Sequence, residues 1–521
     1  MLSSAEIKRL LTAEPEEFAK LLETEQDALN PDFAKHLDEH DPLRLKDLFD
    51  LGPITPFAGH SLGPAFKPAI QAIEAIHTLQ REQLHSGHFP ETAAIGGNWF
   101  DCDVDPDAIA AMQSMLGFSD PCEFVFTQGG LSTNLGNLLD TFYRPTLKDW
   151  KTGKTKICHL ATEFFSDQAV VHSVLQRGIQ TAKQFELFES SPAPHPQALT
   201  LKLLSDDNGL YSSQAIIDFV KQHAHEIQVL HLSDLVFSTG QRLNIAFILQ
   251  ELKKTIEQNH IIVGLDLAHT VGNRQINLQA LDMVTYAVGC AYKHCSGSAG
   301  SPFGIYVNKK TDLDAYPPIQ GWKAAESGKV FARINDFAEE LMARRGALAF
   351  RSSNASPVAL APAQTYVKTM AAVGWDKLTA KSECLTRYML ALLKKHLGDM
   401  LQLITPEQAD ERGATLVFRI KGLKQVSRVE EELKKPSTLG QFEVDTRPPN
   451  NIRVTAHYGY IGFTDIYKMT CRLKEVVNQV LAHEAQSLST LTKVSLFSEI
   501  KPGKLGDKQE QPDEMYSPIG Q

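Results

Sequence analysis

Hydrophobic and polar positions alternate with different periods in different parts of the chain. Near the N-terminus apolar residues recur at helical spacing, as at Ile7, Leu10 and Leu11. The stretch 51–63 is rich in glycine and proline, which interrupt helices. We therefore predict an N-terminal helical segment over residues 1–63.

From about residue 64 short apolar runs alternate with longer amphipathic runs. The short runs have the length and composition of buried strands. They cover residues 123–128, 156–161, 227–237, 260–268 and 283–292. Strands that alternate with helices indicate a mostly parallel sheet with helices on both faces. We predict a large α/β domain over residues 64–328.

Helical patterns dominate the remainder of the chain. Two strand-like stretches, 413–422 and 450–458, precede a final amphipathic helix. This pattern predicts a second, smaller α/β domain over residues 329–485. Residues 486–521 are polar, contain proline and lack apolar periodicity, so we expect a disordered tail.

Composition narrows the class of protein. The chain has 521 residues, 43% of them hydrophobic and 22% charged, as in soluble globular proteins of two or more domains. A net charge of −10 argues against a nucleic-acid or anionic-membrane partner. The N-terminus lacks the apolar core of a signal peptide, and no apolar run could span a membrane. The seven cysteines form no C-x-x-C pair, so we expect free thiols in the cytoplasm and no metal site.

Two charged residues follow neighbouring apolar strands. Asp266 ends one predicted strand, and Lys293 comes directly after the next. Ligands of open α/β sheets bind at the carboxyl ends of the strands. Pyridoxal 5'-phosphate (PLP) needs a lysine for its Schiff base and a carboxylate for its pyridine nitrogen. The pair therefore fits a PLP site, although two unrelated loop charges would produce the same pattern.

Three other strand ends carry residues that suit the same cofactor. Two glycines and Ser132 begin a helix, where backbone amides and hydroxyls bind phosphate. Phe164 and Asp167 lie at the next strand-to-helix turn, and Ser233 ends the strand after it. Each residue alone is equally typical of a turn, a core phenylalanine or a helix cap. Their order along the chain favours a PLP site.

Several motifs resemble kynureninase, a family of PLP enzymes of fold type I with a class V aminotransferase-like fold. The clearest are LDLAHTVGN at 265–273 and CAYKHCSGSAG at 290–300. Further motifs match in order: GHSLG (59–63), LSTN (131–134), FFSD (164–167), GW (321–322), FRSSN (350–354), ITPEQADERGATL (404–416) and NIRV (451–454). The resemblance covers about residues 55–480. It implies a mainly parallel, seven-stranded type of sheet, a small C-terminal α/β domain and a homodimer.

The resemblance also implies roles for individual residues. Lys293 would hold the cofactor and move the substrate's Cα proton, Asp266 would pair with the pyridine nitrogen, and Tyr292 would bind phosphate and relay a proton. These three form the implied catalytic set. The implied cofactor contacts are Leu131, Ser132, Phe164, Asp167, Ser233, Asp266, His269, Tyr292, Lys293, Trp322 and Asn354.

Other residues are implied at the substrate end and at the subunit interface. Trp322 and Asn354 would reach the site from the partner subunit. Arg453 would bind the substrate α-carboxylate with both prongs of its guanidinium, a task suited to arginine. His88 and Ser353 would lie near the substrate.

This chain departs from the family pattern at four positions. His60 replaces an asparagine, and Ala325 stands where the family has a histidine. His294 and Cys295 follow the lysine in place of a tyrosine and a leucine. These changes fall near the substrate end of the implied site and leave the cofactor residues intact.

The implied reaction is hydrolysis of L-kynurenine, or 3-hydroxykynurenine, to anthranilate, or 3-hydroxyanthranilate, and L-alanine. Such an enzyme serves tryptophan catabolism and NAD biosynthesis. Transamination, epimerisation or C–S cleavage of another amino acid would use the same lysine, carboxylate and arginine. A non-catalytic, kynureninase-like binding protein is an alternative of a different class.

Overall fold

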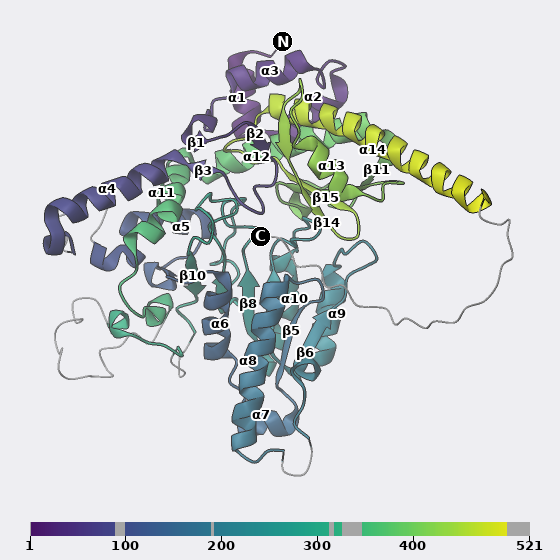
Figure 1. The fold of residues 1–521 in the computed structure, drawn as a ribbon. Helices are drawn as coiled ribbons and strands as arrows, with labels where there is room; N and C mark the ends of the chain where they lie inside the picture. The colour runs from purple at the N-terminus through teal and green to yellow at the C-terminus, as the bar shows by residue number, and fades with distance from the viewer. Residues whose placement is uncertain (1, 89–98, 189–191, 312–316, 326–345, 498–521) are drawn as a thin grey trace.

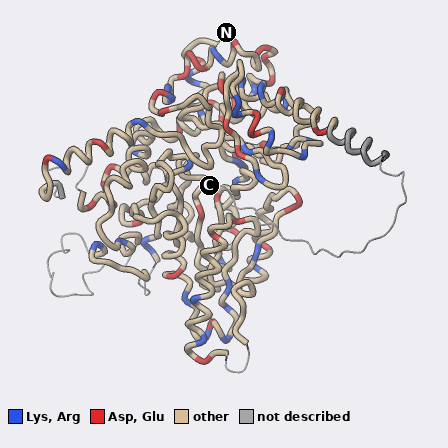
Figure 2. The backbone as a smooth tube through the Cα atoms, in the orientation of Figure 1, with Lys and Arg blue, Asp and Glu red and all other residues tan. Residues whose placement is uncertain are grey.

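The protein is described here by a computed structural model that places residues 2–88, 99–188, 192–311, 317–325 and 346–497. A seven-stranded sheet with its helices occupies the lower half of Figure 1, and a four-stranded sheet with the N-terminal and C-terminal helices lies above it. Acidic and basic residues are interspersed along the backbone of both halves (Figure 2). Among the placed helices none is both long and apolar enough to cross a membrane.

The seven-stranded sheet has the strand order β4-β10-β9-β8-β7-β5-β6. Its strands are β4 (Phe124–Phe126), β5 (Lys156–Leu160), β6 (Thr200–Leu203), β7 (Ile227–Ser233), β8 (Ile262–Asp266), β9 (Tyr286–Val288) and β10 (Gly304–Val307). Strand β10 runs antiparallel to β4 and β9, and the other pairings are parallel. The prediction of a mainly parallel sheet between helices is thus confirmed.

Helices cover this sheet and connect its strands. They are α5 (Pro106–Leu116), α6 (Leu131–Phe142), α7 (Leu147–Thr152), α8 (Phe165–Gln184), α9 (Ser213–His223) and α10 (Ile245–Asn259). The central strands are buried on both faces, which explains why they appear in the sequence as continuous apolar runs. Ser233 is the register partner of Asp266, which pairs with Val288 on the other side. The polar strand ends therefore meet at one edge of the sheet.

The four-stranded sheet is antiparallel. It contains β11 (Leu401–Leu403), β12 (Thr415–Ile420), β15 (Asn451–Thr455) and β14 (Asp445–Arg447) in that order. Strands β12 and β15 lie within the two predicted stretches, whereas β11 and β14 were not predicted. The accompanying helices are α11 (Pro357–Val373), α12 (Trp375–Leu397), α13 (Val426–Leu433) and α14 (Phe463–Phe497). Helix α14 continues past residue 485 into the segment that the sequence assigned to a disordered tail, so that part of the expectation is corrected.

The N-terminal helices pack against the C-terminal half of the chain. They are α1 (Ser4–Thr12), α2 (Pro15–Thr24), α3 (Pro31–His40) and α4 (Lys67–Gln83). Helices α1 and α2 contact α12, α3 contacts α14, and α4 lies along α11. Two small sheets add further links, one of β1 (Phe49–Asp50) with β3 (Ala65–Phe66) and one of β2 (Ile54–Pro56) with β13 (Gln441–Glu443).

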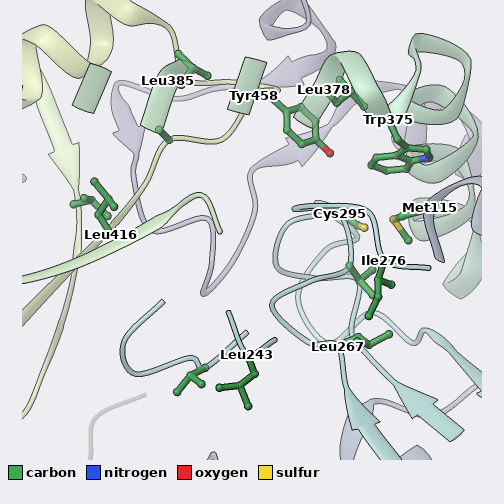
Figure 3. Packing of buried hydrophobic residues seen from close by; sticks show 14 of the residues in the cluster. Met115, Leu243, Leu267, Ile276, Cys295, Trp375, Leu378, Leu385, Leu416 and Tyr458 are labelled. Atoms are coloured by element: carbon green, nitrogen blue, oxygen red, sulfur yellow. The ribbon is translucent and has the colours of Figure 1, made fainter. Parts of the chain in front are cut away.

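A single hydrophobic cluster joins these parts. Figure 3 shows Met115, Leu267 and Cys295 from around the large sheet near Trp375 and Tyr458 from the C-terminal half. All five side chains are buried. The boundaries that the sequence suggests at residues 63, 328 and 485 stay predictions.

Candidate active site

A cavity of about 340 Å³ opens at the carboxyl edge of the large sheet. Its volume falls within the range of pockets that hold small ligands. The lining residues are Gly130, Leu131, Ser132, Thr133, Glu163, Phe164, Ser166, Asp167, Ser233, Leu235, Phe237, Asp266, Ala268, His269, Tyr292 and Lys293. The loops after β4, β5, β7, β8 and β9 thus converge on one site.

Acidic side chains form the floor of this cavity. Asp266 ends β8, Asp167 lies in the first turn of α8, and Glu163 follows β5. All three are buried, and one carboxylate oxygen from each lies within 4.8 Å of the others. The backbone N–H of Ala268 donates to Asp266 Oδ1 at 2.7 Å. Burial raises the pKa of Asp266, and the nearby Lys293 amine opposes that rise.

The lysine lies beside a neutral histidine. Lys293 Nζ is 3.1 Å from His269 Nε2, and both residues follow strand ends of the same sheet. Burial, and then the positive charge of Lys293, hold the pKa of His269 well below its usual value. Burial and the neighbouring Cys290 thiol raise the pKa of Tyr292, so its hydroxyl stays protonated and can donate a proton.

The start of α6 forms the anion-binding end of the site. Gly130 is the N-cap of this 12-residue helix, and its Leu131 and Ser132 begin the first turn. The first backbone N–H groups of a helix lack partners within the helix and attract anions. The hydroxyls of Ser132 and Ser166 are in hydrogen-bond contact at the cavity wall. These groups suit a phosphate.

Two phenylalanines form the apolar wall. Phe164 immediately precedes α8, and its side chain is 47% exposed at the cavity. Its ring lies edge-on to Phe237, with 5.2 Å between the ring centroids. An exposed aromatic face at this place can stack on a flat ligand.

Arg453 lies on β15 and contacts Phe237, a residue that lines the cavity. Its guanidinium is almost fully buried, pairs with Asp445 and donates from Nη1 to the carbonyl oxygen of Phe237 at 2.7 Å. His60 Nε2 contacts the same Asp445 carboxylate at 3.1 Å. Although burial alone would raise it, the contacts with His60 and Arg453 hold the pKa of Asp445 below its usual range. Burial, and then the charge of Arg453, lower the pKa of His60 to about 4.

Some residues implied by the family resemblance do not line the cavity. The Gln128 side chain donates to Ser353 Oγ at 3.2 Å and to the Asn354 carbonyl at 2.7 Å, and none of these three residues lines the cavity. Trp322 is 43% exposed, with its ring 5.4 Å from that of Phe100. The side chain of His88 lies outside the described part of the structure.

Sequence reasoning missed several residues of the site. Glu163, Ser166, Leu235 and Phe237 line the cavity without having been predicted, and Asp445 pairs with the predicted Arg453. Glu163 could have been recognised, because it directly precedes Phe164 at a strand-to-helix turn. The others depend on contacts between distant segments.

The residues present fit PLP. Both carboxylate oxygens of Asp167 are buried and lack a hydrogen-bond partner among the described residues, which indicates that this floor faces a polar group. Asp266 offers the negative charge for a ring nitrogen, the start of α6 offers donors for a phosphate, and Lys293 offers the amine. The arrangement therefore has one partner for each polar part of the cofactor.

Comparisons with known proteins agree with this site. The family model for the kynureninase C-terminal domain matches residues 378–473. A kynureninase of Xanthomonas axonopodis pv. citri is 29% identical over 450 residues, which cover 85% of this chain and 97% of the relative. A kynureninase of Myxococcus xanthus is 28% identical and covers 85% and 96%. The chain is thus similar to kynureninases over most of its length. The predicted resemblance, the enzyme class and the PLP cofactor are confirmed by these relatives.

Solved structures support the fold. A variant of the protein C-DES, with glycine covalently linked to its PLP cofactor, has a TM-score of 0.62 at 15% identity and covers 83% of this chain and 99% of its own. The cysteine desulfurase CsdA from Escherichia coli has a TM-score of 0.61 at 13% identity, with 84% and 99% covered. The predicted fold class is thereby confirmed.

Proposed function

We propose that this protein hydrolyses L-kynurenine, or its 3-hydroxy derivative, to the corresponding anthranilate and L-alanine. One observation carries the proposal. In a chain similar to kynureninases, Lys293 and the Asp266 carboxylate line a single cavity, and the Arg453 guanidinium donates a hydrogen bond to the carbonyl oxygen of Phe237, another residue that lines it. An amine, an anion and a carboxylate-binding cation are the three charges that an amino acid and PLP require together.

PLP, when bound, supplies the electron sink for a carbanion at the substrate's Cα. Lys293 would hold the cofactor and Asp266 would face its ring nitrogen. Asp266 is oriented for this task by the Ala268 N–H, which donates to its other side. Ser132 and the first amides of α6 would bind the phosphate.

Lys293 is the base that removes and returns the proton at Cα. His269, neutral because of its lowered pKa, can accept a hydrogen bond from the Lys293 amine without adding a competing charge. The protonated Tyr292 hydroxyl is a second proton donor on the same loop. A proton can therefore reach either the Cα or the departing fragment.

Arg453 would orient the substrate through its α-carboxylate. Asp445 and the Phe237 carbonyl hold the guanidinium in place, so little ordering is needed when the substrate binds. Phe164 and Phe237 shield that side of the cavity from water. We also propose a homodimer in which Trp322 and Asn354 of each subunit contribute to the site of the other, with His88 and Ser353 near the substrate ring.

Product analysis tests this function. The purified protein with PLP is incubated separately with L-kynurenine and 3-hydroxykynurenine, and the anthranilates and L-alanine are quantified. We expect equal molar amounts of the two products from at least one substrate, and none from Lys293→Ala. Absence of both products from protein that holds PLP would refute the proposed reaction.

A further inference from the structure

The floor of the cavity holds more negative charge than one ring nitrogen needs. Asp266 alone would balance a protonated pyridine, yet Asp167 and Glu163 place their carboxylates within 4.8 Å of it and of each other. Relative exposures of 8%, 2% and 5% for Asp266, Asp167 and Glu163 show that water does not screen them. Three such charges repel one another strongly at low effective dielectric constant.

The three carboxylates differ in their hydrogen bonds. Asp266 accepts the Ala268 N–H, which favours its ionised form. Asp167 has no partner for either oxygen among the described residues, so its ionised form is the least stabilised. Glu163 is intermediate, because it accepts the Ser233 hydroxyl at 2.8–2.9 Å and the Phe164 N–H at 3.1 Å.

These environments separate the titrations of the three groups. Burial, then repulsion by Asp266, raises the pKa of Asp167 well above its usual value. The same two causes, in the same order, raise the pKa of Glu163 to about 7. Glu163 therefore gains and loses a proton near neutral pH. It does so between Asp167, whose protonated form is favoured by burial and repulsion, and Asp266, whose ionised form is favoured by the Ala268 N–H.

We infer that Glu163 is a positioning residue whose ionisation adds a second negative charge to the floor of the site and thereby tightens retention of the PLP ring as pH rises through neutrality. The inference rests on the cofactor assignment within the proposed function. It does not depend on which amino acid is cleaved.

Other groups face Glu163 from each surrounding element. Asp266 on β8 and Asp167 on α8 repel its charge, whereas Lys293 after β9 attracts it. Ser233 on β7 donates a hydrogen bond to Glu163. Tyr211, before α9, contacts Thr162, and burial, together with a smaller effect of the negative charge of Glu163, raises the pKa of its hydroxyl. Lys293 lines the same cavity, so a test must separate its contribution to cofactor binding from that of Glu163.

Binding of 4'-deoxypyridoxine 5'-phosphate to the PLP-free protein makes that separation. This analogue keeps the ring nitrogen and the phosphate but has no aldehyde to condense with Lys293. Its dissociation constant is measured from pH 6 to pH 8.5 for the wild type and Glu163→Gln. The ratio of the two constants cancels the effects of pH that both proteins share, such as ionisation of the analogue's phosphate.

We expect the ratio of variant to wild type to rise from less than about twofold at pH 6 to about tenfold at pH 8.5, since the charge is present only above the Glu163 pKa. Ser233→Ala removes a hydrogen bond that favours the ionised form of Glu163 but keeps the carboxylate, so it should move the tightening to higher pH without abolishing it. Asp218→Asn, an exposed residue on α9, should match the wild type throughout.

A ratio for Glu163→Gln that is the same at every pH would overturn the inference, because it would leave Glu163 only a structural hydrogen bond. Wild-type protein that does not bind the analogue would instead refute the cofactor assignment itself. If Glu163→Gln does not fold, infrared spectra of the wild type test the same point. The intensity of the buried protonated carboxyl band should fall between pH 6 and pH 8 as Glu163 ionises, and an intensity that stays constant across this range would overturn the inference.

Discussion

Arg453 shows how a single side chain is prepared for its ligand. Its guanidinium is buried, held from one side by Asp445 and from another by the Phe237 carbonyl oxygen. Lysine cannot reproduce this geometry, since its ammonium is a point charge without the planar fork of arginine. Substitution of Arg453 by lysine therefore tests the geometry of the side chain separately from its charge.

Arg453→Lys should raise KM for the amino-acid substrate and lower kcat/KM about ten- to a hundredfold, the scale of about 1.5–3 kcal/mol for a charge-assisted hydrogen bond. The absorbance of the bound cofactor should stay the same, because Arg453 does not line the cofactor cavity. Steady-state kinetics and an absorbance scan measure the two effects.

Arg447→Lys is the matched control. Arg447 lies 3.4 Å from the same Asp445 carboxylate, but its side chain is 45% exposed. The Arg447→Lys substitution should leave kcat/KM near the wild-type value. Equal losses in both variants would show that any change beside Asp445 impairs the site, and that the planar guanidinium of Arg453 has no special part in substrate binding.

The residues that could be predicted are those whose neighbours in the sequence explain them. Ser233 and Asp266 end apolar strands and Lys293 lies in the loop after the next strand, so the carboxyl edge of a parallel sheet brings them together. Asp445 and Phe237 are different, because their places depend on how β14 and β15 meet the loop after β7. Nothing in their local sequence signals that contact.

The N-terminal helices illustrate the same limit for whole elements. Their amphipathic spacing predicts the helices, and the buried Ile7, Leu11 and Phe18 confirm the apolar face. Their packing partner could not be read from the spacing. The Phe18 ring lies 5.8 Å from that of Phe463, at the start of α14.

Phe18→Ala should lower the free energy of unfolding by about 3–5 kcal/mol, because it leaves a cavity where a fully buried ring was packed. Urea denaturation measures the loss. Phe185→Ala, at a site that is 60% exposed, should change it far less. If the two variants were equally stable, the N-terminal helices would not be docked on α14 as described.

Short strands are the elements that the sequence predicts least well. Strands β6, β10, β11 and β14 have three or four residues each, too few for a clear alternation. They form because neighbouring strands offer free backbone groups for pairing. The antiparallel direction of β10 likewise follows from its connection to β9, which alternating strand and helix patterns do not reveal.

Across the whole molecule, buried histidines collect between the large sheet and the C-terminal half. His60, His269, His294 and His457 are all held neutral, with burial as the first cause of their lowered pKa values. His294 is fully buried, and neither of its ring nitrogens has a hydrogen-bond partner among the described residues. Protonation of such a group must destabilise the folded protein.

A histidine whose folded pKa is lowered stabilises the fold above its unfolded pKa of about 6.5, and that stability is lost as pH falls below it. The wild type should lose free energy of unfolding when the pH falls from 7.5 to 5.5. In His294→Phe this loss should be smaller by about 1.4 kcal/mol, because the variant lacks the histidine that must stay neutral in the fold. Urea denaturation at the two pH values measures the difference. His172→Phe, which changes an exposed residue of α8, should have no such effect. An unchanged acid sensitivity in His294→Phe would mean that His294 is solvated or paired in solution.

The account depends most on Lys293 as the residue that holds the cofactor. Reduction of the purified, PLP-loaded protein with borohydride, followed by peptide mass analysis, tests this directly. We predict a pyridoxyl group on the peptide that contains Lys293, and its loss in Lys293→Ala. A label on a different lysine, or no label on protein that holds PLP, would contradict the account.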